Sequence, residues 1–254
     1  MGECFAYREA LFQLLARDLK LKYQRTSLGY AWSLLNPVLQ LTVLTVVFSH
    51  IVRLEMKDYT LYLFSGLLVW QFIQTSLMTS APAFFEQEAF IKKIYLPKIL
   101  FPFTKVFMRF FDFMLALLAL TFIGIIAGFP FKETVLYLPI PVILSFGFTL
   151  GASILVAIAT VYFRDIEYLI QVFLQLLYFA TPILYPLHLL PERYHLFVKL
   201  NPIYTQVNLF QHLIYAGTLP SSGEWLAATL VTVVTLGLAI WLMAKTENEL
   251  VFRL

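Results

Sequence analysis

An uninterrupted apolar run near the C-terminal end, residues 225–244, constrains the fold of this chain more than any other feature. The run contains neither a charged residue nor a proline. A helix needs about 20 such residues to cross the roughly 30 Å of hydrocarbon in a bilayer, so the run predicts a transmembrane helix. The composition agrees with this, because 13% of the 254 residues are charged, whereas soluble domains are about 25% charged.

Five other apolar stretches precede this run. We therefore predict an all-α membrane protein with a single transmembrane domain, residues 1–254, that contains six transmembrane helices. The fourth stretch is long, which predicts a tilted helix or one that extends into water. Small residues four apart, Gly124 with Gly128 and Gly147 with Gly151, predict close helix packing. The six predicted spans are residues 34–52, 61–84, 107–129, 135–163, 168–186 and 225–244.

The 18 lysines and arginines predict the orientation, because the cytoplasmic segments of membrane proteins carry an excess of basic residues. If the N-terminus is cytoplasmic, thirteen of them lie at the inner surface (18 minus five). Both termini are then predicted to be cytoplasmic. The five basic residues that remain outside are Arg53, Lys57, Lys132, Arg193 and Lys199.

Residues 1–25 are predicted to form a cytoplasmic interface helix. Within them, residues 4–23 combine apolar residues near helical spacing with charged residues on the other faces. This pattern is typical of a helix that lies on membrane lipid. A helix that packs on a soluble domain is the alternative.

The outer segment between the fifth and sixth spans, residues 187–223, is too apolar for a soluble loop and too interrupted for a full span. Pro191 can begin one short helix. Asn201 and Pro202 supply an N-cap and a first-turn proline for another, which we expect to end near Gly217. We predict two short re-entrant helices, because protein or a cavity can satisfy the backbone of such segments. A pair of interfacial helices is the alternative.

Polar side chains recur along one face of three predicted spans. In the fifth span they are spaced by three and four residues, which places them on one helical face. A shared pathway for a polar substrate explains these stripes, and interhelical hydrogen bonds of about 0.6–2 kcal/mol each are the alternative. The predicted pathway residues are Ser33, Asn36 and Gln40 in the first span, Gln71 and Thr75 in the second, and Tyr168, Gln171, Gln175, Tyr178 and Tyr185 in the fifth.

The chemistry of these stripes is uncharged and consists of amides, hydroxyls and aromatic rings. Such groups bind sugars, because amides and hydroxyls pair with sugar hydroxyls while rings cover the C–H faces. An ion or proton pathway usually contains buried carboxylates or histidines. Arg109 and Asp112, at i and i+3 in the third span, are expected to pair with each other near the inner edge. A proton-relay role for Asp112 is the alternative.

Motifs for catalysis and metal binding are absent from the sequence. It contains no HExxH, no G-x-S-x-G and no G-x-x-x-x-G-K-[ST] phosphate loop, and Cys4 is its one cysteine. We therefore predict a transport subunit, not an enzyme, without a metal site or cofactor of its own. Any ATP hydrolysis would take place on another chain. The net charge of +3 is too small to indicate nucleic-acid binding.

The inner connection between the second and third spans, residues 86–98 (EQEAFIKKIYLPK), combines charges with an apolar face. We predict that this docking segment inserts into the groove of a partner protein. An amphipathic helix on the membrane surface is the alternative. The predicted contact residues are Glu86, Glu88, Phe90, Lys92, Lys93 and Tyr95.

Several segments together match one family. On these segments the chain resembles the membrane subunits of type-2 ABC exporters for polysaccharides, in particular the O-antigen exporter permeases of the Wzm type. The resemblance covers nearly the whole chain. The matching segments are residues 23–37 (YQRTSLGYAWSLLNP), 86–97, 162–166 (YFRDI) and 181–186 (TPILYP), and Asn201-Pro202 with the helix that follows.

The resemblance implies a homodimer of six-span subunits in the bacterial inner membrane, with a continuous channel between the two subunits. Two copies of a cytoplasmic ATPase of the Wzt type would bind ATP and Mg²⁺. The substrate would be a polysaccharide linked to undecaprenyl pyrophosphate. By similarity, residues 86–98 correspond to the coupling helix on the ATPase, residues 4–23 to the interface helix, and the two short outer helices to the closure of the periplasmic exit.

Lys20, Lys22 and Arg25 lie where a pyrophosphate would reach the inner membrane surface. Charge-assisted contacts make them candidates for binding it, and general attraction to anionic lipid is the alternative. Two other functions remain open. Export of a small lipid or drug would need a closed hydrophobic pocket, and an intramembrane enzyme acting on lipid-linked sugar would need paired buried carboxylates or a metal site.

Overall fold

The computed structural model describes residues 8–23, 29, 32, 35, 38–40, 42–43, 59–93, 96–126, 128 and 131–253, and all regular secondary structure within these ranges is helical. This agrees with the predicted all-α fold. The helices are α2 (Arg8–Tyr23), α4 (Tyr59–Ser80), α5 (Ala83–Glu86), α6 (Glu88–Lys93), α7 (Leu100–Ile126), α8 (Pro139–Tyr162), α9 (Ile166–Ala180), α10 (Glu192–Leu200), α11 (Pro202–Phe210) and α12 (Ser222–Arg253), with the 3-10 helices η2 (Glu133–Tyr137) and η3 (Leu187–Leu189) and the π-helix η4 (Gln211–Ala216).

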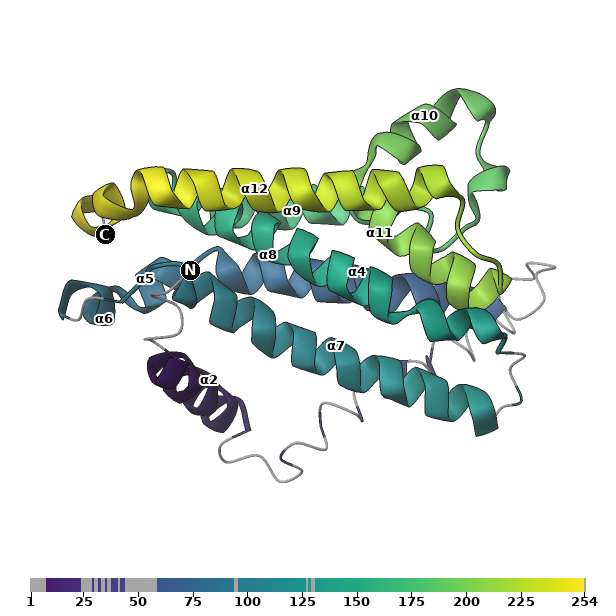
Figure 1. Cartoon of the computed structure of the whole chain (residues 1–254), viewed down its shortest axis with the longest axis horizontal. Coiled ribbons are helices and arrows are strands. Elements are labelled where there is room, and N and C mark those ends of the chain that lie inside the picture. The colour runs from purple at the N-terminus through teal and green to yellow at the C-terminus, as the bar shows by residue number, and fades with distance from the viewer. Residues whose placement is uncertain are drawn as a thin grey trace.

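Five long helices, α4, α7, α8, α9 and α12, pack along the long axis of the molecule (Figure 1). One end of this bundle carries α5, α6 and the C-terminal part of α12. There, Nζ of Lys98 lies 3.8 Å from Oε1 of Glu247, and the hydroxyl of Tyr162 donates to Glu249. The opposite end carries α10, α11 and η4. We call these the inner end and the outer end, after the predicted orientation.

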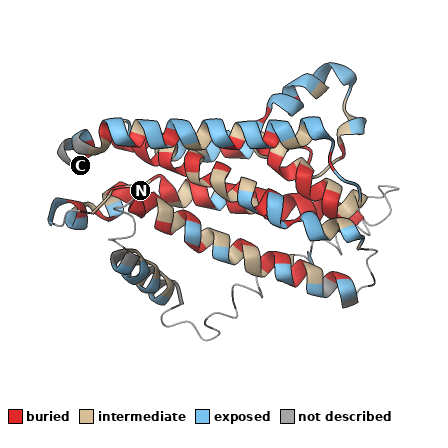
Figure 2. Ribbon diagram, viewed as in Figure 1, coloured by how far each residue is buried: buried red, intermediate tan, exposed pale blue. Residues whose placement is uncertain are grey.

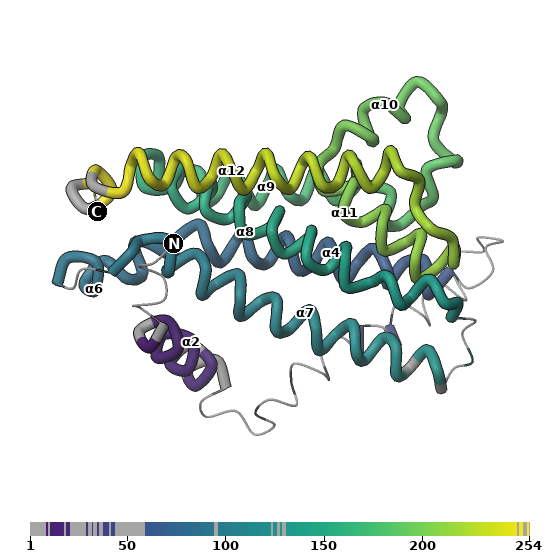
Figure 3. Tube along the Cα trace, in the orientation of Figure 1, coloured from purple at the N-terminus to yellow at the C-terminus, as the bar shows by residue number. Residues whose placement is uncertain are grey.

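Successive long helices run in opposite directions, as the trace in Figure 3 shows. Three ranges among the described residues are long and apolar enough to cross a membrane, namely Tyr59–Ser80, Pro139–Tyr162 and Ser222–Glu247. They correspond to the second, fourth and sixth predicted spans. The 32 residues of α12 extend over about 48 Å, so this helix is longer than the hydrocarbon is thick. The full set of six spans and the cytoplasmic position of both termini stay predictions.

The central helix of the bundle is α4, and all of its residues from 61 to 70 are buried (Figure 2). It packs against α7, α8, α9 and α11. A helix that is apolar around its whole circumference is suited to burial on all sides. Gly66 permits the close approach of the outer segments, because a Cβ there would lie 2.9 Å from Nε2 of Gln211 and 3.2 Å from Cγ1 of Val207.

The most extensive helix pair is α8 with α12. A Cβ added at Gly151 would lie 2.8 Å from Cα of Leu236, and one at Gly147 would lie 3.0 Å from Cγ2 of Thr232. The predicted packing role of this glycine pair is therefore confirmed. The same prediction was wrong for Gly128, which lies beyond the end of α7 with a φ of 72° and so belongs to a turn.

The fifth predicted span is only partly helical, which corrects the sequence prediction of one continuous face over residues 168–186. Its helix, α9, has 15 residues, or about 22 Å, and ends at Ala180. The chain then continues without helix to residue 186, and Pro182 and Pro186 lack the N–H that a helix would use. Tyrosines of α4 satisfy the carbonyls instead, because the Tyr62 hydroxyl donates to the oxygens of Pro182 and Tyr185 at 2.9 and 2.8 Å.

The two short outer helices form where the sequence predicted them. Pro191 precedes α10 as its N-cap residue, and Asn201 caps α11 by accepting a hydrogen bond from the Ile203 N–H at 3.0 Å. Gly217 ends η4 in the left-handed conformation, with a φ of 59°. Asn201 also donates from Nδ2 to Oγ1 of Thr181, 2.9 Å away, and Thr181 donates in turn to the last turn of α9. Their re-entrant position in a membrane stays a prediction.

The remaining expectations concern the N-terminal half of the chain. The first predicted span, residues 34–52, lies outside the described residues apart from residues 35, 38–40 and 42–43. A helix does form within residues 4–23, and this helix, α2, packs on α7. The expected pair of Arg109 and Asp112 is confirmed, with 3.5 Å between its charged atoms.

Candidate functional site

Two predicted pathway residues from different spans are joined directly. Nε2 of Gln71 in α4 donates a hydrogen bond to Oε1 of Gln40, 2.7 Å away. The polar stripes of the first and second predicted spans therefore meet here. Each amide uses one hydrogen-bonding site in this contact and keeps its other donor and acceptor sites. Ser33 and Asn36, from the same predicted stripe, lie outside the described residues.

A second contact joins α4 to α9. The Trp70 ring lies 5.4 Å from the Tyr178 ring, centroid to centroid, and its Nε1 donates to Oε1 of Gln74 at 2.9 Å. Trp70 is only 2% exposed, and a buried indole N–H needs such a partner. Trp70 therefore contacts both an amide of α4 and a phenol of α9.

The polar face of α9 continues from Tyr178 toward the inner end and is open. Gln171 and Gln175 are exposed, and Tyr168 is 69% exposed. Leu174, on another side of the helix, is buried against the bundle. Within the described part of the chain, α9 therefore has an uncovered amide-bearing face and, next to it, an uncovered apolar face. The exposed apolar residues of α9 are Leu169, Val172, Phe173, Leu176 and Phe179.

Two other predicted pathway residues use their hydroxyls within their own segments. Oγ1 of Thr75 donates to the carbonyl of Gln71 at 2.6 Å, one helical turn earlier. The Tyr185 hydroxyl donates to the carbonyl of Phe179 at 2.6 Å and so ties the irregular segment back to α9. Thr75 still lies on the exposed face of α4, but Tyr185 does not extend the helical stripe of α9.

Sequence reasoning missed Trp70 and Gln74, although both belong to the arrangement. Gln71, Gln74 and Thr75 have the spacing i, i+3 and i+4, which marks one helical face. Gln74 could therefore have been predicted as part of the stripe from the sequence. The spacing of Trp70 and Gln74, i and i+4, indicates a possible side-chain contact in the same way. No sequence signal gives the ring contact to Tyr178, because it joins residues from different helices.

The predicted docking segment begins at the last residue of α5 and contains α6, both at the inner end. Oε2 of Glu86 lies 2.7 Å from Nζ of Lys105 in α7, and Oε1 of Glu88 lies 2.6 Å from Nζ of Lys92 within α6. Solvent-exposed pairs of this kind contribute about 0–1 kcal/mol each. They orient the segment more than they stabilise the fold.

Two phenylalanines, one in the docking segment and one just before it, contact arginines of neighbouring elements at the inner end. The Arg17 guanidinium of α2 lies 5.1 Å from the ring centroid of Phe90, which is 40% exposed. The Arg164 guanidinium, in the turn before α9, lies 4.8 Å from the ring centroid of Phe85. These cation–π contacts connect the interface helix, the docking segment and the inner turn.

The other predicted inner contact residues are described only in part. The Lys20 and Lys93 side chains are exposed. Arg25, Tyr95 and the Lys22 side chain lie outside the described residues, so the candidate pyrophosphate cluster stays a prediction. In the part of the chain that the structure describes, no group of three or more His, Cys, Asp or Glu side chains could hold a metal ion.

The chain matches known proteins over most of its length. Residues 9–215 match the family described as ABC-2 type transporter. The O-antigen export system permease protein RfbA of Myxococcus xanthus is 31% identical over 250 residues, which cover 97% of this chain and 96% of that protein. RfbA of Klebsiella pneumoniae is 30% identical over 214 residues, 82% of this chain and 83% of that protein. The polysialic acid transport protein KpsM of Escherichia coli is 25% identical over 250 residues, 95% of this chain and 93% of that protein.

The family match and the structure agree with each other. The match covers well over half of the chain, the RfbA relatives align over most of their length, and the described helices include three that are apolar enough to span a membrane. The chain belongs to the ABC-2 type transporter family.

Proposed function

We propose that this chain is the membrane-spanning permease subunit of an ABC transporter that exports a polysaccharide of the O-antigen type, linked to undecaprenyl pyrophosphate. The similar proteins are named for O-antigen export and for polysialic acid transport, which supports a polysaccharide as the substrate class. The chain is a transport subunit. A separate cytoplasmic ATPase of the Wzt type binds ATP and Mg²⁺ and supplies the energy.

One observation carries the proposal, namely the uncharged polar surface on α4 and α9. Gln40 pairs with Gln71, Trp70 links Gln74 to the Tyr178 ring, and the exposed glutamines of α9 extend the same chemistry toward the inner end. Polar groups in a membrane are expensive unless they are paired or face a cavity. Amides and phenols without a buried charge suit a chain of neutral sugars passing along them.

A second copy of the chain supplies the opposite wall of the pathway. In a single subunit α9 leaves both its polar face and its apolar face uncovered. Lipid would cover the apolar face at no cost but would leave Gln171 and Gln175 without partners. A homodimer in which the two α9 helices border one lumen keeps these amides in water or against substrate.

The docking segment transmits the movement of the ATPase to the membrane helices. Glu86 forms an ion pair with Lys105 in the first turns of α7, and the Phe90 ring makes a cation–π contact with Arg17 of the interface helix. A partner that moves the docking segment would therefore act on α7 through Glu86 and on α2 through Phe90. Lys92 and Lys93 are exposed on α6 and are available for contact with the ATPase.

The proposal includes a topology and a role for the inner basic residues. The chain crosses the bacterial inner membrane six times with both termini inside, and α10 and α11 enter the outer leaflet from the periplasm. The alternating directions of the long helices support this arrangement. Lys20, Lys22 and Arg25 bind the pyrophosphate of the lipid-linked substrate at the inner surface.

Deletion of the gene in its own host tests the proposal. We expect the polysaccharide to disappear from the cell surface and its lipid-linked form to accumulate on the cytoplasmic side. The unaltered gene should reverse both effects, and extra copies of the ATPase gene should not. Unchanged surface polysaccharide after deletion would show that the chain exports something else.

A further inference from the structure

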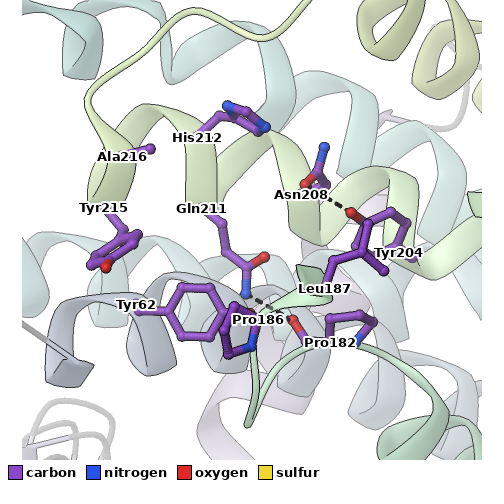
Figure 4. A pocket seen from close by; sticks show the side chains of 10 residues that line it. All are labelled: Tyr62, Pro182, Pro186, Leu187, Tyr204, Asn208, Gln211, His212, Tyr215 and Ala216. Atoms are coloured by element: carbon purple, nitrogen blue, oxygen red, sulfur yellow. Dashed lines mark hydrogen bonds between the residues drawn. The ribbon is translucent and has the colours of Figure 1, made fainter. Parts of the chain in front are cut away.

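A cavity of about 130 Å³ lies at the outer end of the bundle, away from the polar face of α4 and α9. It is bordered by α4, by the irregular segment after α9, and by α11 with η4 (Figure 4). At about 10–15 Å³ for each water-sized group, it has room for roughly ten such groups. We call it the outer tyrosine pocket, and its lining residues with polar or aromatic side chains are Tyr62, Tyr204, Asn208, Gln211, His212 and Tyr215.

The spacing along α11 and η4 explains why these side chains converge. Five of them are separated by four, three, one and three residues, which places them on one helical face. Their helix changes to π-helical geometry from Gln211 to Ala216, a form that is rare and is found often at functional sites. Oγ1 of Thr134 in η2 donates to the carbonyl of Leu213 in this π-helix at 2.8 Å, and Nζ of Lys132, just before η2, donates to that of Ala216 at 3.3 Å.

The walls of the pocket are held firmly. The Tyr62 hydroxyl donates to two carbonyls of the irregular segment, and Nε2 of Gln211 donates to one of them, that of Pro182, at 3.0 Å. The Tyr62 and Tyr215 rings meet edge to face at 5.2 Å. The Tyr204 hydroxyl donates to Oδ1 of Asn208 at 3.1 Å. A preformed wall of this kind loses little conformational entropy when a ligand binds.

Some hydrogen-bonding capacity in the pocket is left over. Among the described residues, no side chain or backbone group donates to Oε1 of Gln211, whereas its Nε2 is bonded to the carbonyl of Pro182 (Figure 4). The Tyr204 hydroxyl uses its proton as a donor and keeps acceptor lone pairs. A ligand that donates several hydroxyl protons matches this set.

The Glu224 carboxylate near the pocket is already compensated by its hydrogen-bond partners. Oε1 of Glu224 accepts from Nδ2 of Asn208 at 2.7 Å and lies 3.3 Å from Nε2 of His212, and its Oε2 accepts from Ser221. A carboxylate with these partners orients Asn208 and His212 but leaves little attraction for a cation in the cavity. It also disfavours an anion. Aromatic faces, an amide oxygen and a lining that contains no Asp, Glu, Lys or Arg favour a neutral polyhydroxylated ring.

We infer that the outer tyrosine pocket binds one neutral pyranose unit of the polymer as it leaves the bundle, an inference that rests on the proposed function. The Tyr215 ring, which the buried Tyr62 ring supports edge to face, covers the C–H face of the sugar, and Oε1 of Gln211 and the Tyr204 hydroxyl accept its hydroxyl protons. The pocket holds a single unit because of its size. The exit side of the pathway therefore has a site that binds one sugar unit of the polymer at a time.

The test measures saturation transfer by NMR from the permease to small ligands, with the permease in complex with its ATPase in lipid nanodiscs. The probes are the methyl glycosides of mannose, galactose, rhamnose and N-acetylglucosamine, with choline as the cationic counter-probe. Two variants fill the pocket from opposite walls, Ala216→Phe and Leu187→Phe. The control is Leu219→Phe, at an exposed residue outside the lining. Size-exclusion profiles and melting temperatures establish that each variant is folded.

We expect transfer to at least one glycoside, weakened about tenfold or more by either filling variant, since loss of a well-fitted contact has this effect, and unchanged in the control. Equal transfer in the filled and unfilled proteins, transfer to no glycoside, or transfer to choline alone would each overturn the inference. If only one filling variant folds, that variant decides. Surface polysaccharide in cells that carry the unaltered gene tests the proposed function separately, so its presence without glycoside binding would remove only the pocket.

Discussion

Gln71 of α4 and Gln40 of the preceding predicted span share a hydrogen bond of 2.7 Å from Nε2 to Oε1. This bond joins two apolar segments that are 31 residues apart in the sequence. It allows the two readings of the polar stripes, substrate pathway and helix packing, to be separated by experiment.

The substitution Gln71→Leu should reduce both stability and export. It leaves the Gln40 amide without a partner, and interhelical hydrogen bonds in membranes contribute about 0.6–2 kcal/mol. The double variant Gln40→Leu with Gln71→Leu removes both partners and should recover most of the melting temperature, but not export. Recovery of export together with stability would identify the pair as packing alone.

The ring of Tyr178 should matter more than its hydroxyl. Trp70 contacts this ring at 5.4 Å, and aromatic pairs contribute about 0.5–1.5 kcal/mol beyond buried area. Tyr178→Ala should therefore impair surface export while the protein is still inserted and still binds the ATPase, and Tyr178→Phe should retain most activity. Leu176→Ala, on the exposed apolar face of the same helix, is the control, and an equal loss in the control would place the effect in helix packing.

The α8–α12 contact should be intolerant of a single methyl group. In Gly151→Ala the new Cβ would lie 2.8 Å from backbone atoms of Leu236, and overpacking of this kind costs about 1–3 kcal/mol. A loss of roughly 2–4 °C in melting temperature per kcal/mol is expected for a chain of this size. Gly237→Ala, in a helix position with no neighbour within 4 Å, should leave the melting temperature unchanged or raise it. A similar fall in both variants would argue against a tight contact at Gly151.

Charge reversal on α6 should uncouple ATP hydrolysis from export. Lys92→Glu with Lys93→Glu changes two exposed residues and breaks only the exposed pair with Glu88, so folding should be affected by less than about 1 kcal/mol. ATP hydrolysis by the complex should continue while surface polymer falls. Lys199→Glu, exposed at the outer end, is the matched control. Normal coupling in the double variant would direct attention to a different contact with the ATPase.

Much of the fold could be predicted from local sequence. The apolar run of residues 225–244 lies within α12, the Asn201-Pro202 pair caps α11, and Gly217 ends the π-helix as expected. Each of these depends on residues that are neighbours in the chain or on the thickness of a bilayer. Local physical rules are sufficient for them.

The break after Ala180 and the contacts of Trp70 could not be predicted in the same way. An apolar sequence with two prolines is compatible with a kinked helix as well as with an irregular segment. There the hydroxyls of Tyr59 and Tyr62, more than a hundred residues away in the sequence, donate to backbone carbonyls in place of backbone N–H groups. Periodicity shows which residues share a face, but not which other helix that face meets.

The link between Thr181 and Asn201 has a mechanical consequence. The Thr181 hydroxyl donates to the last turn of α9 and accepts from Asn201, the N-cap residue of α11. The two helices are therefore joined directly through one side chain. A rotation of α9 about its own axis would therefore displace the first turn of α11, because both helices share this hydroxyl.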